Sequence, residues 1–357
     1  MLRIGIVGLS QVGKTTLFRI LTRVHGKGAA PGKLEAHKGV VHVPDERLDR
    51  LSDLYKPKRT VHASVEYLDT PGGVIELART GLQAQALREV NALAHVVRAF
   101  EDGSAAGSND PRRDIENVEL ELILSDLALV EKRLERLEKD IKKQKNPALE
   151  KEQRVLEHCK SALERQSPLR ELDLVPEDEL AIRGFTFFSQ KPVLYVLNLG
   201  EKDAARANAA EEFACEAGLR QRPNTAVSAI CGKVEAELAE LSDAEATEFL
   251  ASYGLEESAI ARLIRASYRL LGLISFFTVG EDECRAWTLR SGTSALDAAG
   301  EIHTDIQRGF IRAEVVKYED LLAAGSLSEA RHRAQLRLEG KEYVVRDGEV
   351  VHFRHSG

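Results

Sequence analysis

Apolar and polar residues alternate along the chain in blocks that predict strands and helices in turn. Leu2–Val7 is an apolar run of the length of a buried strand, and Thr16–Thr22 follows it with a pattern compatible with a helix. Val61–Leu68 and Pro192–Leu197 are further apolar runs that predict strands. Strands that alternate with helices indicate an α/β domain. We also expect a helix over 75–94, strands over 96–100 and 225–229, and an amphipathic helix over 258–273.

A heptad pattern distinguishes the middle of the chain. Apolar side chains recur there at alternating intervals of three and four, with mostly charged residues between them. Asn146-Pro147 breaks this helix, and leucines at intervals of seven continue after the break. We therefore expect an antiparallel coiled-coil hairpin, whose basic tip is either a solvated helix end or a contact for RNA phosphate. The heptad positions are Leu120, Ile123, Leu127, Val130, Leu134, Leu137 and Ile141, and the basic residues are Lys139, Lys142, Lys143 and Lys145.

The pattern turns to short strands after residue 276. Strand candidates are 285–289, 313–317, 343–346 and 349–353, and residues 295–306 read as a helix between them. Asp347-Gly348 has the composition of a tight turn and predicts a hairpin between the last two candidates. These elements predict a small α+β domain at the C-terminal end.

Composition narrows the classes of partner. The chain has 357 residues, of which 43% are hydrophobic and 30% charged, so it can bury a sizeable core. A net charge of −7 gives no overall attraction to nucleic acid or to a membrane, and an aromatic content of 5% argues against a base-stacking surface. No membrane-spanning segment is visible. The four cysteines lack metal-ligand spacing and indicate free thiols in a reducing cytosol.

The strongest motif lies between the first strand and the first helix. Gly8-Leu9-Ser10-Gln11-Val12-Gly13-Lys14-Thr15 has the P-loop spacing G-x-x-x-x-G-K-S/T. The glycines allow main-chain N–H groups to face phosphate oxygens, and the helix that follows adds its positive end. Lys14 is predicted to reach the β- and γ-phosphates, and the Thr15 hydroxyl to bind Mg²⁺. The predicted nucleotide-binding residues of this loop are Gly8, Ser10, Gln11, Val12, Gly13, Lys14, Thr15 and Thr16.

A second motif ends the strand over 61–68. Asp69-Thr70-Pro71-Gly72 fits a D-x-x-G element, in which Asp69 holds a water of the Mg²⁺ shell and the Gly72 N–H senses the γ-phosphate. The alternative is a simple turn at the end of a strand. Gly73 follows where a glutamine could orient the attacking water, so we expect slow intrinsic hydrolysis.

The base should be read by Asn198-Leu199-Gly200-Glu201, which follows a buried-type strand. GTPases place N-K-x-D at this point, and the longer Glu201 is expected to misplace the guanine contact. The amide of Asn198 can satisfy an adenine edge, so the sequence favours ATP over GTP. Ser228-Ala229 is expected to form the last base-contacting loop.

The chain resembles the YchF/Obg-like ATPase family over nearly its whole length. The most specific similarities are the N-x-x-E residues 198–201 and the stretch 191–196. Residues 111–137 resemble the coiled-coil insertion of the family. The segments 285–288, 298–305, 309–315 and 338–341, with Asp347-Gly348, resemble the TGS domain of that family.

The resemblance implies three parts and a partner. These are an α/β P-loop nucleotide-binding domain over 1–110 and 175–277, a coiled-coil insertion over 111–174 and a β-grasp TGS domain over 278–357. It further implies a cytoplasmic ATPase that associates with the ribosome or rRNA through the basic tip and the TGS domain, without a membrane. We expect a monomer.

Departures from the family leave the activity open. Ser10-Gln11 replaces the family's Pro-Asn, which argues against K⁺ dependence, and the family's switch threonine aligns with Lys33. One hypothesis is a slow, Mg²⁺-dependent ATPase that the ribosome stimulates. The alternatives are a nearly inactive nucleotide-sensing adaptor on the ribosome and a GTP-binding protein.

Overall fold

The computed structural model describes residues 2–25, 37–69, 81–100, 110–144, 146–216 and 222–356. The chain divides into two compact units. Unit 1 comprises Met1–Val41 and Glu66–Leu270, and unit 2 comprises His42–Val65 and Leu271–Gly357. The domain bounds that the family resemblance implies place residues 42–65 in the nucleotide-binding domain, whereas the structure groups them with the C-terminal unit. That unit also begins at Leu271 rather than at residue 278.

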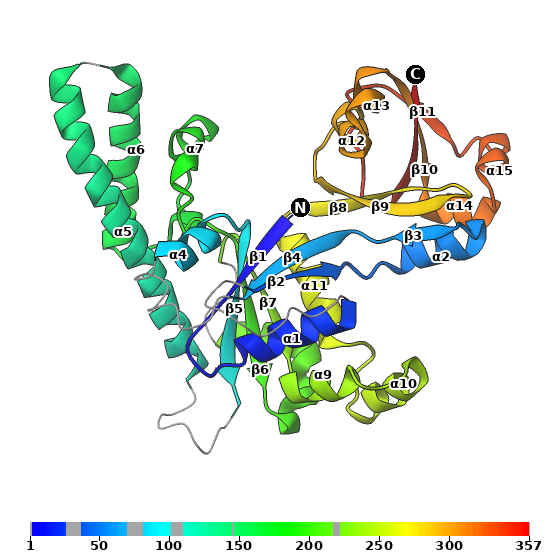
Figure 1. The fold of residues 1–357 in the computed structure, drawn as a ribbon, viewed down its shortest axis with the longest axis horizontal. Coiled ribbons are helices and arrows are strands. Elements are labelled where there is room, and N and C mark those ends of the chain that lie inside the picture. Colours follow the sequence, from blue (N-terminus) through cyan, green and yellow to red (C-terminus); the bar gives the residue numbers. More distant parts are fainter. Residues whose placement is uncertain are drawn as a thin grey trace. The chain divides into compact units, whose positions relative to one another are not determined.

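A six-stranded sheet with the order β2-β4-β1-β5-β6-β7 forms the centre of the nucleotide-binding fold (Figure 1). The pairs β1–β5, β5–β6 and β6–β7 are parallel, as the alternation of strands and helices predicts. β5 begins at Ala92, so the helix expected over 75–94 ends earlier, and its described part is α4 (Gly81–Arg88). The strands are β1 (Leu2–Val7), β2 (His37–His42), β4 (Ser64–Asp69), β5 (Ala92–Ala99), β6 (Val193–Leu199) and β7 (Thr225–Ile230).

Several helices of unit 1 pack on this sheet. The first turns of the arm helix α5 bury Ile115, Val118 and Leu122 against strand residues such as Leu93 and Tyr195. α11 packs against β6 and β7, and α1 contacts β1. No helix within the described residues is both long and apolar enough to cross a membrane. Besides α4 and α5, the helices of the unit within the described residues are α1 (Lys14–His25), α6 (Pro147–Glu164), α7 (Pro176–Ile182), α8 (Ala210–Glu216), α9 (Gly232–Leu238), α10 (Asp243–Ser252) and α11 (Ala259–Leu270), with 3₁₀ turns η1 (Leu169–Glu171), η2 (Arg183–Phe185) and η3 (Glu201–Ala209).

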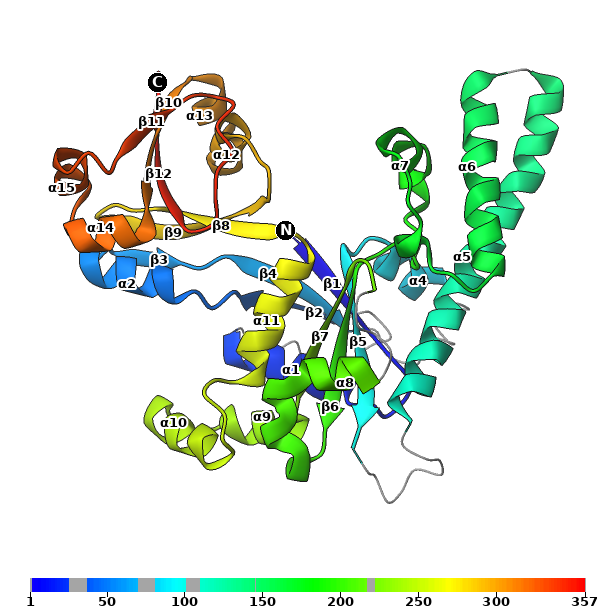
Figure 2. The same ribbon diagram turned by 180° about the vertical axis from the view of Figure 1, so that it is seen from behind.

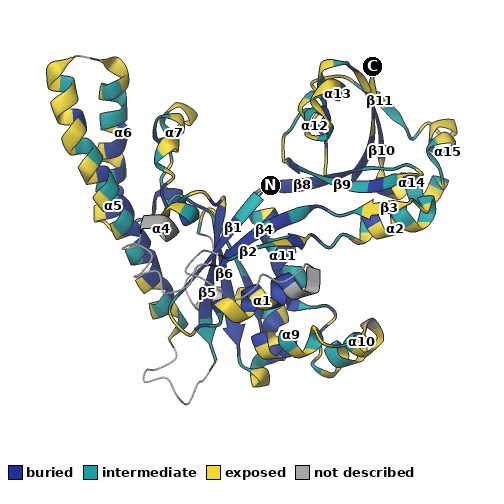
Figure 3. Cartoon of the chain, in the orientation of Figure 1, coloured by how far each residue is buried: buried dark blue, intermediate teal, exposed yellow. Residues whose placement is uncertain are grey.

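The predicted coiled-coil hairpin is confirmed by α5 (Pro111–Lys143) and α6 (Pro147–Glu164), which lie side by side in both views (Figure 2). The Asn146 side chain caps α6 by accepting a hydrogen bond of 2.9 Å from the Ala148 N–H. Buried positions follow the heptads, while the outward positions are exposed (Figure 3). The seam includes Val130 and Leu137 of α5 and Leu156, Cys159 and Leu163 of α6.

Unit 2 is built on a second six-stranded sheet, of order β11-β10-β12-β8-β9-β3. Its central pair β8–β12 is parallel, and each of these strands has an antiparallel neighbour, β9 for β8 and β10 for β12. The helix α12 packs against these strands with Ala295, Ala298 and Ala299 buried in the core. This is the arrangement of a β-grasp domain. Its strands are β3 (Arg59–Val61), β8 (Leu273–Thr278), β9 (Glu283–Arg290), β10 (Phe310–Lys317), β11 (Arg337–Glu339) and β12 (Glu349–His355), and its helices are α2 (Glu46–Tyr55), α12 (Ala295–Ile302), α13 (Thr304–Arg308), α14 (Tyr318–Ala324) and α15 (Leu327–His332).

The hairpin expected around Asp347-Gly348 is absent from the described residues of unit 2. Residues 343–346 form no strand, and β12 pairs instead with β10 and β8. The Asp347 side chain accepts a hydrogen bond of 2.9 Å from the Ser275 N–H, and the Gly348 N–H donates to the Ser275 carbonyl. The Asp-Gly pair therefore turns the chain toward β8 rather than back on itself.

Candidate nucleotide-binding site

The P-loop connects β1 to α1 and contains two glycines at positions where any other residue would be strained. Gly8 has φ +148°, and a Cβ there would lie 2.5 Å from the Val96 carbonyl oxygen of β5. Gly13 has φ +101°, and its Cβ would lie 2.5 Å from the Asn198 amide nitrogen. The loop is therefore pressed against the carboxyl ends of β5 and β6, where ligands of parallel sheets bind.

The polar residues of the motif lie where the sequence predicts. Lys14 is buried, and its ammonium donates to the carbonyl oxygens of Gly8 at 3.2 Å and Leu9 at 2.5 Å. Thr15 and Thr16 occupy the first turn of α1, and Val12 is buried beneath the loop. Of the remaining loop residues, Ser10 and Gln11 are exposed, and Gln11 has a positive φ of 62°.

Asp69 and Thr15 are brought together as a Mg²⁺ site requires. Asp69 ends β4 with 1% of its surface exposed, and its Oδ1 has no hydrogen-bond partner among the described residues. Burial raises the pKa of Asp69, and a hydrogen bond with Thr15 and the charge of Lys14 partly offset this effect. A buried carboxylate oxygen without a partner, next to a threonine hydroxyl, suits a hard cation with oxygen ligands.

Three sequence predictions fall outside the described residues. Gly72 and Gly73 of the D-x-x-G element and Lys33 of the preceding connection belong to segments for which the structure gives no placement. The γ-phosphate contact of Gly72 therefore stays a prediction.

Asn198 connects the two loops that should enclose the base. Its Nδ2 donates to the Val12 carbonyl at 3.1 Å, and its Oδ1 accepts from the Gly232 N–H at 3.1 Å. The side chain is buried, with 8% exposed. Asn198 thus holds the P-loop to the β7–α9 loop, which leaves one N–H of its amide and one lone pair of its oxygen for a base.

Glu201 begins η3, directly after β6, and forms an ion pair. Its carboxylate contacts the Lys233 ammonium, and its Oε1 accepts a hydrogen bond of 3.3 Å from the Tyr253 hydroxyl. The hydrogen bond with Lys233 lowers the pKa of Glu201, which keeps the carboxyl group ionised. Leu199 is buried in the core with its side chain among the sheet residues, so only its main chain can face a nucleotide.

The predicted position of the last base loop needs a correction. Ser228 and Ala229 lie within β7, opposite Val196 and Leu197 of β6, and both are buried. β7 continues to Ile230, and the residue that contacts Asn198 is Gly232. The predicted strand ends too early, because Ile230 and Cys231 extend the apolar run that marks it.

Replacing Asp69 by asparagine should stabilise the free protein while weakening the candidate Mg²⁺ site. A raised folded-state pKa means that the Asp69 contribution to stability is present at low pH and lost as the pH rises through that pKa. The D69N variant should therefore melt about 2 °C above the wild type at pH 8, with a smaller difference near pH 4. The same variant should bind Mg²⁺–ATP about tenfold more weakly, or roughly 1.4 kcal/mol.

Differential scanning calorimetry at both pH values and isothermal titration with Mg²⁺–ATP measure the two effects. D53N, a change at an exposed aspartate of α2, serves as the control. A melting temperature of D69N below that of the wild type at pH 8 would contradict the burial argument.

Comparison with known proteins agrees with this geometry. Residues 3–151 match a family model described as "50S ribosome-binding GTPase", and residues 273–356 match the YchF-GTPase_C model, described as a protein of unknown function (DUF933). The "Ribosome-binding ATPase YchF" of Bacillus subtilis (strain 168) is 42% identical over 99% of this chain and 98% of its own length. The chain belongs to the YchF family.

Other YchF proteins give the same result. The "Ribosome-binding ATPase YchF" of Escherichia coli O157:H7 is 40% identical over 98% of each chain. The solved structure of the Schizosaccharomyces pombe YchF GTPase matches with a TM-score of 0.84 and 31% identity over 99% of this chain and 97% of that one. The P-loop domain, the helical insertion and the C-terminal domain are therefore the YchF architecture.

Proposed function

We propose that this chain binds ATP with Mg²⁺ at its P-loop, hydrolyses it slowly and associates with the ribosome. The observation that carries the proposal is the joint placement of Lys14, Thr15 and Asp69 beside the Asn198 bridge. The names of the curated relatives, which call them ribosome-binding ATPases, support the ribosome as partner.

The division of labour follows from the positions of the side chains. Lys14 neutralises phosphate charge from the start of α1, and the N-terminal end of this helix adds its positive dipole. Thr15 and Asp69 supply oxygen atoms to hold Mg²⁺ and its water shell, and the bound ion would neutralise charge on the phosphates. Asn198 keeps the P-loop and the base loop at a fixed spacing. Gly73 stands in the sequence where a glutamine could orient the attacking water, so we expect slow hydrolysis.

The choice of ATP over GTP rests on Glu201. A carboxylate at this point of the fold can accept the two N–H groups of a guanine edge only if its oxygens can turn toward the base. Here each oxygen already has one partner, Lys233 for one and Tyr253 for the other, and these contacts hold the carboxylate in its present orientation. A guanine must therefore compete with the ion pair to place its two N–H groups on Glu201. An adenine does not have this pair of N–H groups, so the ion pair does not weaken its binding.

Freeing and shortening the carboxylate should recover guanine binding. In the double variant E201D/K233M the carboxylate lacks its ammonium partner, so we expect the ratio of GDP to ADP affinity to rise about tenfold, since hydrogen bonds to a charged acceptor contribute about 1.5–3 kcal/mol. The control is K202M, a change at the exposed lysine next to Glu201. Isothermal titration with both diphosphates measures the ratio, and an unchanged ratio would remove Glu201 as the discriminating residue.

Turnover and ribosome binding test the whole proposal. Phosphate release from ATP and from GTP is measured with Mg²⁺, with and without purified ribosomes, and co-sedimentation reports association. We expect slow ATP turnover that ribosomes accelerate, and less turnover with GTP. Faster turnover of GTP would favour a GTPase, as the fission-yeast relative is called. Binding without any turnover would favour a nucleotide-sensing adaptor. We further propose that the chain is a monomer, which the molar mass from light scattering checks.

A further inference from the structure

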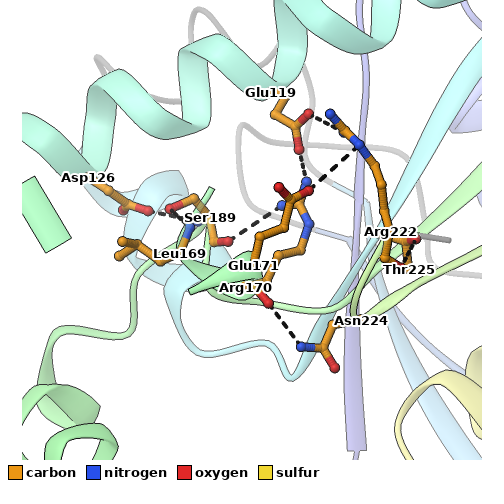
Figure 4. A network of polar contacts seen from close by, with 9 residues as sticks. All are labelled: Glu119, Asp126, Leu169, Arg170, Glu171, Ser189, Arg222, Asn224 and Thr225. Carbon is orange, nitrogen blue, oxygen red and sulfur yellow. Dashed lines mark hydrogen bonds and ion pairs between the residues drawn. The ribbon is translucent and has the colours of Figure 1, made fainter. Parts of the chain in front are cut away.

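The root of the helical arm, where α5 packs against the nucleotide-binding domain, carries two buried acidic residues. Glu119 and Asp126 are seven positions apart on α5 and therefore lie on one face of the helix. Asp126 is fully buried and accepts hydrogen bonds from the N–H groups of Phe188 at 3.0 Å and Ser189 at 2.7 Å. Figure 4 shows the contact between Asp126 and Ser189 beside a larger charged cluster that surrounds Glu119.

The cluster around Glu119 is balanced in charge. The Glu119 carboxylate contacts the guanidinium groups of Arg170 and Arg222, the latter at 2.7 Å (Figure 4). Arg222 also lies 3.6 Å from the Glu171 carboxylate, and the Arg170 carbonyl accepts a hydrogen bond from Asn224. Two arginines thus meet two glutamates. This balance is what a buried ionic cluster requires, since an unpaired buried charge is strongly destabilising.

Several buried polar atoms at this cluster have no hydrogen-bond partner among the residues that the structure describes. They include His95 Nε2 of β5 and Arg170 Nε, although the Arg170 side chain does form a hydrogen bond with the Tyr195 side chain. Only 3% of His95 and 4% of Arg170 is exposed. Burial lowers the pKa of His95 to about 3, so its imidazole is neutral at physiological pH and carries one donor and one acceptor nitrogen.

Both side chains line a small internal cavity. Its volume is about 10 Å³, and all nine lining residues are buried. A space of this size holds one water molecule, and a cavity lined by an imidazole, a guanidinium, a carboxylate and a phenol is polar enough to keep it. The lining residues are Val7, Leu93, His95, Val118, Glu119, Leu122, Arg170, Val193 and Tyr195.

We propose that this cavity binds a single water molecule, which accepts a hydrogen bond from Arg170 Nε and pairs with His95 Nε2. The water completes a polar joint that runs from Glu119 of the arm through Arg170 to β5. His95 is paired in register with Val7 of β1, the last strand residue before the P-loop. The joint therefore fixes the arm to the strands that carry the nucleotide-binding loop. This inference stands independently of the proposed function.

A crystal structure of the full chain at high resolution tests the site directly. We expect one isolated density peak in the cavity, about 3 Å from both His95 Nε2 and Arg170 Nε. An empty cavity, or a His95 ring that bonds Glu119 without an intermediary, would overturn the proposal.

A double-mutant cycle tests the bridge in solution. H95F and R170M each remove one partner of the water, and the two side chains share no direct hydrogen bond within the described residues. If the water couples them, the shift in urea midpoint of the double variant will be smaller than the sum of the single shifts. The matched control pairs R170M with H158F, a change at an exposed histidine of α6, and should be additive. Additive shifts for H95F with R170M would overturn the proposed bridge, and the crystal structure decides the case if a variant fails to fold.

Discussion

Replacing Lys14 by methionine is expected to lower the affinity for Mg²⁺–ATP by about 100-fold, or roughly 2.7 kcal/mol. The Lys14 side chain is buried, and its ammonium donates hydrogen bonds to the Gly8 and Leu9 carbonyls of the P-loop. The positive charge therefore lies where the phosphates would bind. Methionine keeps much of the length of the side chain and its packing but removes the charge. Removing one partner of a close charge pair costs about 2–5 kcal/mol in a desolvated site.

Isothermal titration measures the loss of affinity for K14M, and calorimetric melting shows that the variant is folded. K132M, a change at an exposed lysine of α5, keeps the same chemistry away from the loop and should bind as the wild type does. An affinity of K14M within about threefold of the wild type, a difference of less than about 0.7 kcal/mol, would show that the P-loop does not hold the phosphates.

Replacing Asp126 by alanine is expected to destabilise the protein by about 3 kcal/mol. The change leaves the N–H groups of Phe188 and Ser189 without their acceptor in a fully buried place, and each lost partner costs about 1–3 kcal/mol. Part of this cost is offset, because burial raises the pKa of Asp126 and makes its charged form expensive to keep. Arg88 of α4 lies 3.6 Å from the same carboxylate and would lose its charged partner as well. We therefore expect the loss of stability to be largest at the root of the arm.

Urea unfolding followed by circular dichroism gives the change in stability for D126A. E138A, which removes an exposed carboxylate further along the same helix, should change stability by less than about 0.5 kcal/mol. Equal unfolding midpoints for D126A and E138A would mean that the buried hydrogen bonds at the arm root contribute nothing.

Features that depend on residues close in sequence could be predicted. The P-loop follows from the spacing of Gly8, Gly13 and Lys14, because each residue contacts its neighbours in the chain. The coiled-coil hairpin follows from heptads that repeat along α5 and from the capping signal at Asn146. Asp69 could be placed because it ends an apolar run that forms a strand. In each case local chemistry and the final fold agree.

Features that depend on partners far along the chain could not be predicted. β3 pairs with β9, so Arg59 lies opposite Glu283, and nothing local in either segment indicates that pairing. Glu119 and Asp126 read as two charges among many on a solvated helix, since their partners come from the η1 turn and the segment before β6. The ion pair of Lys233 could not be predicted either, because its partner Glu201 follows β6 whereas Lys233 lies in α9, after β7.

We propose that an adenine nucleotide binds between the P-loop and the Asn198 bridge. Isothermal titration of the full chain with Mg²⁺–ATP, repeated with Mg²⁺–GTP, measures this binding. We expect one ATP site per chain, with an affinity for ATP at least several-fold higher than for GTP. No heat of binding with either nucleotide, or tighter binding of GTP, would contradict it.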